Sequence, residues 1–174
     1  MLSQPNNQEL YYSYAQIVLQ DIPDEISLAL SISGCPLRCK GCHSSFTHNP
    51  KFGSLLTDQE LHQLIQKNKY ITTVLFYGGE WNPIRLTQLL QIVKEYNLFT
   101  ALFSGHEPEQ IDKQILQHLD IIKVGPYIPE LGGLTSPQTN QRYIDPKVYL
   151  NTGKEDLLYK DNKRLGQNYG KSSA

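Results

Sequence analysis

Large apolar and small side chains alternate strictly over residues 26–33. A period of two predicts a β-strand over this segment. The face expected to pack under helices consists of Ile26, Leu28, Leu30 and Ile32. The other face carries only serine and alanine, which is equally typical of a strand beside a bound cofactor and of an edge strand with one face in solvent. Aromatic and β-branched residues over 11–20, followed by a turn, predict a preceding strand.

Helix and strand patterns then follow one another along the chain. Thr57 and Glu60 have the spacing of a capping box, which predicts the start of a helix. A strand is predicted over 72–77, and Asn82 followed by Pro83 predicts the start of a second helix. The positions expected to form the buried faces of these two helices are Leu61, Leu64, Ile65, Leu86, Leu89, Leu90 and Val93.

The same alternation continues beyond the second helix. We predict a strand over 98–103, a helix that carries Ile111, Ile115 and Leu119, and a strand over 120–124. Strands that alternate with helices predict an α/β fold with a parallel sheet and crossover helices. After this point, proline and glycine interrupt the pattern.

Chain length limits the number of domains. The 174 residues suffice for one domain with a hydrophobic core and are too few for two. We expect that domain to occupy residues 1–150. The last stretch, 151–174, is polar and bears lysines, and we expect it to be a mobile tail with little to bury or a segment that a partner orders.

The balance of charge excludes several classes of function. The chain has 16 basic and 17 acidic side chains and a formal net charge of −1, whereas proteins that bind nucleic acid through its phosphates carry a basic surplus. No apolar run approaches the roughly 20 residues that a membrane-spanning helix needs. The N-terminal sequence lacks the layout of a secretion signal. We therefore expect a cytoplasmic protein without nucleic-acid or membrane partners.

The three cysteines of the chain are Cys35, Cys39 and Cys42. They directly follow the alternating strand, on a loop of the kind where parallel α/β domains build their sites. An odd number of closely spaced cysteines does not form a disulfide framework, so the pattern favours a metal site. Two sites remain open: a zinc ion completed by His43 or His48, or a 4Fe-4S cluster with one iron free to bind another ligand.

In combination, these residues resemble the radical S-adenosylmethionine (radical SAM) superfamily. The resemblance rests on the C-x3-C-x2-C loop and on Gly78-Gly79-Glu80 at the end of the next strand. It implies that the three cysteines ligate three irons of a 4Fe-4S cluster. The amino and carboxylate groups of S-adenosylmethionine would chelate the fourth iron. It also implies that Gly78, Gly79 and Glu80 receive the amino group of that methionine, since a carboxylate and closely approaching backbone suit an ammonium.

Further positions narrow the resemblance to one family. Ser33-Gly34-Cys35, the turn Gly125-Pro126-Tyr127 and the segment 136–142, which ends in Asn-Gln-Arg, are similar to the activating protein of anaerobic (class III) ribonucleotide reductase. This resemblance covers residues 11–144. It implies an incomplete (β/α) barrel of the radical SAM type, with a mostly parallel sheet and an open lateral face.

The resemblance also implies a reaction. A reduced cluster passes one electron to S-adenosylmethionine, whose carbon–sulfur bond breaks to give methionine and a 5′-deoxyadenosyl radical. That radical removes a hydrogen atom from a glycine of the large catalytic subunit of the reductase, which then stores a glycyl radical. The implied partners are this subunit and a low-potential electron donor such as flavodoxin.

Additional cofactor contacts follow from the same resemblance. Gly41, Cys42 and His43 are expected to line the cofactor site near the adenine, and Ser104 is expected to contact the carboxylate or the ribose. Many members carry an aromatic residue in place of Gly41 or His43. Lys123 stands where many members carry an acidic residue.

Two other functions stay open at this point. The chain could be a small radical SAM enzyme that acts on a free metabolite, of the deazapurine-forming type, or a non-catalytic zinc-binding module. Chain length favours a protein substrate over a metabolite. A complete eight-unit barrel takes roughly 250 residues, so this chain must leave its sheet open on one side, where a glycine loop of a large protein could reach the cofactor.

Overall fold

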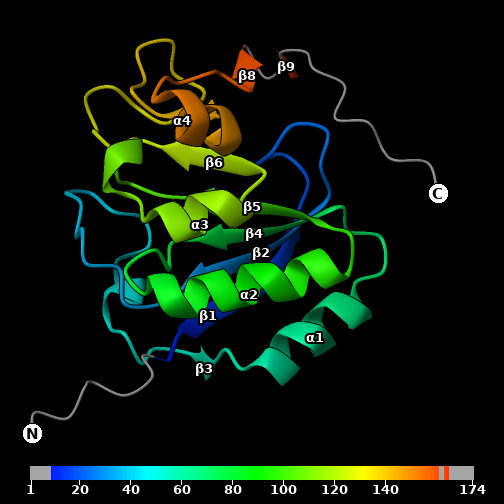
Figure 1. Ribbon diagram of the computed structural model, residues 1–174. Coiled ribbons are helices and arrows are strands. Elements are labelled where there is room, and N and C mark those ends of the chain that lie inside the picture. Colours follow the sequence, from blue (N-terminus) through cyan, green and yellow to red (C-terminus); the bar gives the residue numbers. More distant parts are fainter. Residues whose placement is uncertain (1–8, 161–162, 165–174) are drawn as a thin grey trace, which may run out of the picture.

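The fold is an open mixed sheet whose helices lie on one face (Figure 1). The computed structural model describes residues 9–160 and 163–164. The strand order in the main sheet is β3-β1-β2-β4-β5-β6-β7, and β8 and β9 pair in a separate two-stranded sheet. The strands are β1 (Tyr11–Val18), β2 (Ser27–Ile32), β3 (Ser54–Leu55), β4 (Thr73–Tyr77), β5 (Phe99–Phe103), β6 (Ile121–Val124), β7 (Arg142–Ile144), β8 (Tyr159–Lys160) and β9 (Lys163–Arg164).

Four central strands run parallel, namely β2, β4, β5 and β6, while β1, β3 and β7 pair antiparallel to their neighbours. The predicted α/β class with a mostly parallel, open sheet is therefore confirmed. The helices are α1 (Asp58–Lys67), α2 (Pro83–Glu95), α3 (Lys113–His118) and α4 (Pro146–Thr152), with short 3-10 turns at Ser45–His48 and Pro108–Gln110.

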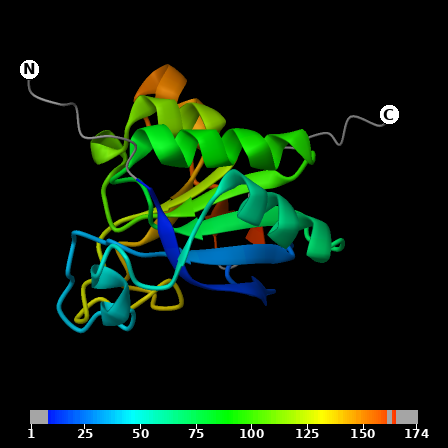
Figure 2. The ribbon, with the colours of Figure 1, turned by 90° about the horizontal axis from the view of Figure 1, so that it is seen from below.

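The main hydrophobic core lies between the sheet and these helices. Figure 2 shows α2, α3 and α4 stacked over one face of the sheet. The apolar positions that the sequence predicts for α1 and α2 pack there, with Leu64 half-buried and the others buried. The predicted helix start at Asn82 is also confirmed, since its side-chain oxygen accepts a hydrogen bond from the Arg85 amide at 3.2 Å.

Strand β2 lies between β1 and β4, and all of its residues are buried, because apolar clusters cover both faces of the sheet there. The edge-strand interpretation is therefore wrong. Leu28, Leu30 and Ile32 pack under the helices as predicted, but Ile26 precedes the strand and is 37% exposed. The small side chains of the other face leave room there, and Ser31 lines a cavity.

Only one of the two hydrogen bonds of the capping box predicted at α1 is present. The Thr57 hydroxyl accepts a hydrogen bond from the Glu60 amide at 3.0 Å. The Glu60 carboxylate instead accepts a bond from the Tyr12 hydroxyl at 2.5 Å, which ties α1 to the neighbouring strand β1. A long-range contact has thus replaced a local one.

Strand β7 and helix α4 are among the elements after Gly125 that the sequence did not predict. Strand β7 pairs with β6, and Asp145 caps α4 by accepting bonds from the amides of Lys147 and Val148. Leu158 and Tyr159 belong to the stretch that was expected to have little to bury. Both are buried against the face of the sheet opposite the helices. Residues 161–162 and 165–174 of that stretch lie outside the described residues, so its mobility stays a prediction. No helix in the described part of the chain is long and apolar enough to cross a membrane.

Candidate functional site

A cavity of about 350 Å³ lies at the carboxyl ends of the parallel strands. This is a volume typical of small-molecule sites. Each central strand or the loop that follows it contributes to the lining. The residues that matter for the chemistry are Cys35, Leu37, Cys39, Cys42, Tyr77, Gly78, Glu80, Phe103, Ser104, Lys123, Tyr127 and Gln141.

The cysteine loop, residues 35–42, follows β2 and is held by hydrogen bonds at both ends. The amides of Gly34 and Cys35 both donate to the Thr47 carbonyl, at 2.6 and 3.3 Å. The Cys42 amide donates to the Cys39 carbonyl at 3.1 Å, and the Ser44 amide donates to the Cys42 sulfur at 3.4 Å. This wrapping brings all three thiols to the lining of one cavity.

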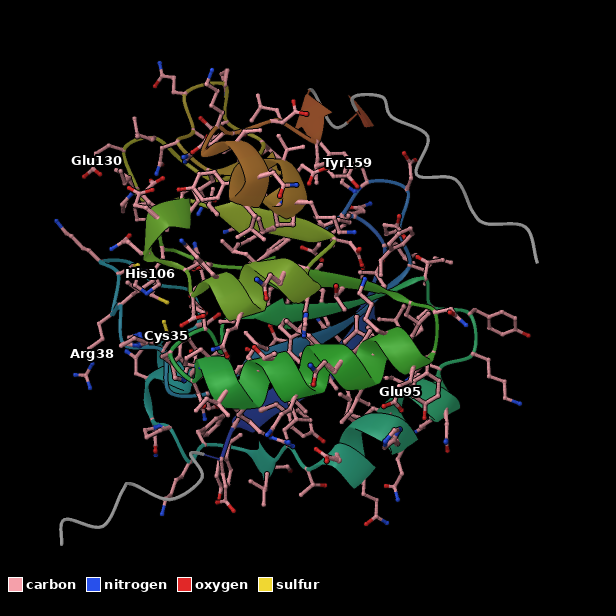
Figure 3. The ribbon with its side chains drawn as sticks, viewed as in Figure 1. Cys35, Arg38, Glu95, His106, Glu130 and Tyr159 are labelled. Carbon is pink, nitrogen blue, oxygen red and sulfur yellow. The ribbon has the colours of Figure 1, made fainter. Side chains whose placement is uncertain are left out.

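The three cysteines are free thiols and are half-buried. Burial raises the pKa of Cys35, and the negative charge of Glu80 adds to the effect. Within the described residues, no three histidine, cysteine, aspartate or glutamate side chains are close enough to hold a single metal ion. Figure 3 shows Cys35 on the same edge of the molecule as His106, with Arg38 extending away into solvent.

Glu80 lies in the turn between β4 and α2 and is 9% exposed. The Ser104 hydroxyl donates a hydrogen bond to its Oε1 atom at 2.5 Å. Its other oxygen, Oε2, is buried and has no hydrogen-bond partner among the described residues. Burial raises the pKa of Glu80, while the Ser104 hydrogen bond and the positive charges of His106 and Lys123 counteract that rise. A buried carboxylate oxygen without a partner is an acceptor left for a ligand.

The two glycines before Glu80 have different roles. Gly78 lines the cavity with φ of +83°, and a Cβ there would lie 2.6 Å from Cη2 of Trp81. No other residue fits this position without displacing the indole ring. A Cβ on Gly79 would instead meet the side chains of Ile32 and Leu10 at 3.6 Å, so Gly79 faces the hydrophobic core and not the cavity.

Of the other residues predicted to contact the cofactor, some line the cavity and some do not. Cys42 and Ser104 line the cavity, whereas Gly41 and His43 do not. His43 is exposed, and its ring lies 5.9 Å from that of Tyr127. The cysteine loop is thereby packed beside the loop that follows β6, as Figure 2 shows for the cyan and yellow segments.

The structure adds residues to the site that sequence reasoning did not assign. Lys123 projects into the cavity from β6, and burial lowers its pKa to about 8 although Glu80 and Cys39 favour the charged form. Tyr77 hydrogen-bonds to Asp21, and burial together with that carboxylate raises the pKa of its phenol. Leu37 and Phe103 supply apolar walls.

The late Asn-Gln-Arg segment reaches the site through the turn after β6. The side-chain amide of Asn140 donates to the Pro126 carbonyl at 2.9 Å, and the side-chain amide of Gln141 donates to the Gly125 carbonyl at 3.4 Å. These bonds hold the Gly-Pro-Tyr turn, from which Tyr127 enters the lining beside Gln141. The sequence singled out both segments but did not indicate that they bind each other.

The comparison with protein families decides which metal site this is. The model of the family described as "4Fe-4S single cluster domain" matches residues 26–143. The chain belongs to this family. Its cofactors are a 4Fe-4S cluster of the radical SAM type and S-adenosylmethionine. Family membership therefore favours the cluster over the zinc module that the cysteine spacing left open.

The chain is also similar to the pyruvate formate-lyase-activating enzyme of Clostridium pasteurianum. The two sequences are 32% identical over 104 residues, which cover 56% of this chain and 44% of the relative. The chain thus matches less than half the length of that relative.

The cavity fits the cofactors of a 4Fe-4S single cluster domain. Three free thiols on one loop are the donors that such a cluster needs, with one iron left for another ligand. The unpartnered Oε2 of Glu80 can accept from an ammonium. Carbon-rich walls from Leu37, Tyr77 and Phe103 complete an enclosure of mixed polarity.

Proposed function

We propose that this chain is a radical SAM activase that generates a glycyl radical on anaerobic ribonucleotide reductase. The observation that carries the proposal is the convergence of three free thiols and a buried carboxylate on one cavity at the carboxyl ends of parallel strands. Polar groups gathered in this way, on loops held by a rigid sheet, are typical of catalytic sites.

The residues of the cavity have distinct tasks in this proposal. Cys35, Cys39 and Cys42 would hold the cluster, and Glu80 would accept hydrogen bonds from the amino group of S-adenosylmethionine. When bound, the reduced cluster and S-adenosylmethionine supply one-electron cleavage of a carbon–sulfur bond. The apolar side chains of Leu37 and Phe103 line the cavity and would keep water from the reacting atoms, which limits side reactions.

A protein target is supported by two observations. The similar clostridial protein is named as an enzyme that activates pyruvate formate-lyase, which is itself a protein. The sheet of the present chain is open, with β3 and β7 as its two edges. An open sheet leaves lateral access for a loop of a large partner.

The choice of ribonucleotide reductase as the target rests on the turn after β6. Asn140 and Gln141 bind the Gly125-Pro126 turn through their side chains, and these two segments carry the resemblance to the reductase-activating family. Pyruvate formate-lyase is the competing target, because the clostridial relative is named for it.

Activation in vitro would test the proposal. The protein is reconstituted anaerobically with iron and sulfide, reduced, and incubated with S-adenosylmethionine and either a class III reductase subunit or pyruvate formate-lyase. We expect a glycyl-radical doublet in the electron paramagnetic resonance spectrum with the reductase only. A doublet only with pyruvate formate-lyase would replace the target, and a protein that binds zinc and leaves S-adenosylmethionine intact would contradict the activity. Cys39→Ala is the negative control.

A further inference from the structure

Strand β1 leaves most of one edge unpaired. It lies between β2 and β3 (Figure 1) and pairs with β2 along nearly its whole length. On the other side, β3 reaches only Tyr11 and Tyr12. Residues 13–18 therefore form a free edge of the sheet, to which no further strand pairs in the described part of the chain. Such an edge offers backbone N–H and C=O groups to another strand.

The side chains of this edge do not oppose pairing. Residues 13–20 contain no charged residue and no proline, which are the usual means by which an edge strand excludes a second strand. Exposed apolar side chains gather at the end of β1, where Ile17 is 42% and Leu19 is 65% exposed. A hollow of about 290 Å³ beside them is lined by Ile17, Ile26 and Tyr70. Contiguous apolar surface of this kind is typical of a protein interface.

Helix α1 runs beside this edge in the same direction as β1. Near the start of α1, Glu60 accepts the hydrogen bond from Tyr12, and at its end Lys67 lines the same hollow as Ile17. The first turn of α1 is acidic and its last turn is basic. The Asp58 side chain is 62% exposed, and the exposed Lys67 has no ion-pair partner within 4.0 Å among the described residues.

A second copy of this chain is complementary to both features. When two identical strands pair antiparallel, a two-fold axis perpendicular to the sheet relates the two copies. Both α1 helices then lie on the same face of the joined sheet and run in opposite directions. The acidic start of each helix thereby faces the basic end of the other, while the uncharged strands bring no like charges together.

We propose that the chain forms a homodimer in which residues 13–18 of β1 pair antiparallel with the same residues of a second copy, with the two α1 helices side by side. The pairing extends the main sheet across both copies and covers the apolar hollow. The opposite edge strand, β7, takes no part, so a protein substrate keeps access from that side. The dimer does not depend on the proposed function.

Sedimentation velocity of the anaerobically reconstituted full-length protein would test the dimer. We expect a species of about twice 19.9 kDa. Ile17→Lys places a charge on the edge and should weaken association at least about tenfold. Leu157→Lys is the matched control, because Leu157 is also 42% exposed but bridges to Ile144 of β7 at the opposite edge. This variant should remain dimeric, and circular dichroism verifies that both variants are folded.

Charge reversal tests the arrangement of the helices. Lys67→Glu and Asp58→Lys each replace the two symmetric attractions of the dimer by repulsions, so each variant alone should associate about tenfold more weakly at low ionic strength. A mixture of the two variants restores both attractions in the heterodimer, which should therefore form as tightly as the wild-type dimer.

Three outcomes would overturn the proposal. The first is a monomeric wild type, including one whose β1 edge binds only a different protein. The second is a dimer that Ile17→Lys leaves intact or that Leu157→Lys disrupts equally. The third is a mixture of the charge variants that associates no better than either variant alone. Cleavage of S-adenosylmethionine, measured on the same samples, tests the proposed function separately.

Discussion

The hydroxyl of Ser104 is bonded to Oε1 of Glu80 across a separation of 24 residues, at 2.5 Å. Ser104 follows β5, and Glu80 follows the neighbouring strand β4, so the bond joins two strand ends. It orients the carboxylate and leaves Oε2 without a partner among the described residues. A carboxylate held in this way is prepared for a cationic ligand, because one oxygen is fixed and the other is available.

Replacement of Glu80 by glutamine tests this arrangement. The change keeps the shape of the side chain and removes its charge. We expect Glu80→Gln to weaken binding of S-adenosylmethionine at least about tenfold, since hydrogen bonds to charged groups contribute about 1.5–3 kcal/mol. Equilibrium dialysis of the reconstituted protein measures the effect. Glu95→Gln, on the exposed end of α2 (Figure 3), is the control, and equal affinities of the two variants would contradict the role of Glu80.

Each cysteine should be indispensable for the cluster. We expect Cys35→Ala, Cys39→Ala and Cys42→Ala each to lose bound iron and sulfide and to lose cleavage of S-adenosylmethionine. The physical reason is that a cluster with one open iron has no thiolate to spare. Iron and sulfide analysis and release of methionine measure the two properties.

His43→Ala provides the matched control on the same loop. His43 is exposed and does not line the cavity, so this variant should keep its cluster. Loss of metal in His43→Ala, together with zinc in the wild type, would support the zinc site that the cysteine spacing left open.

Substitution of Gly78 should affect both stability and binding. In Gly78→Ala, the new Cβ would lie 2.6 Å from the Trp81 ring at a backbone φ of +83°. We expect a loss of about 1–3 kcal/mol in the free energy of unfolding and weaker binding of S-adenosylmethionine. Urea unfolding measures the loss of stability. Gly133→Ala, where a Cβ meets nothing within 4 Å, should be as stable as the wild type, and similar stabilities of both variants would contradict the predicted clash.

Asp120 should make the stability of the fold depend on pH. Burial would raise the pKa of Asp120, but hydrogen bonds from Lys94, Thr100 and Lys147 hold it below its ordinary value. A lowered pKa in the folded state adds stability above about pH 4, the value of the unfolded chain, and this contribution is lost as the pH falls through the folded pKa. We expect Asp120→Asn to be about 1–3 kcal/mol less stable than the wild type at pH 7.

Urea unfolding of Asp120→Asn at several pH values measures this dependence. The difference from the wild type should decrease as the pH falls below about 4. Asp58→Asn is the control, because Asp58 pairs with Arg85 while its side chain is 62% exposed; it should cost at most about 1 kcal/mol. A difference for Asp120→Asn that does not vary with pH would exclude the carboxylate as its source.

The sequence by itself determined several local elements and the position of the cysteines. Alternation in β2, the cap at Asn82 and the apolar stripe of α2 are all set within a few residues, and the structure has them as predicted. The loop after β2 was also placed correctly at the carboxyl end of a parallel strand, because strand and helix alternation fixes the direction of the strands.

Only the tertiary structure decided which of these residues share the cavity. Gly78 and Gly79 are adjacent, yet one lines the cavity and the other faces the core. Lys123 and Gln141 enter the site because sheet pairing and the turn after β6 bring distant segments together. Local periodicity defines which side chains share a face of a strand. Which face is covered by helices, and which loops meet above the strand ends, depends on contacts between residues far apart in the chain.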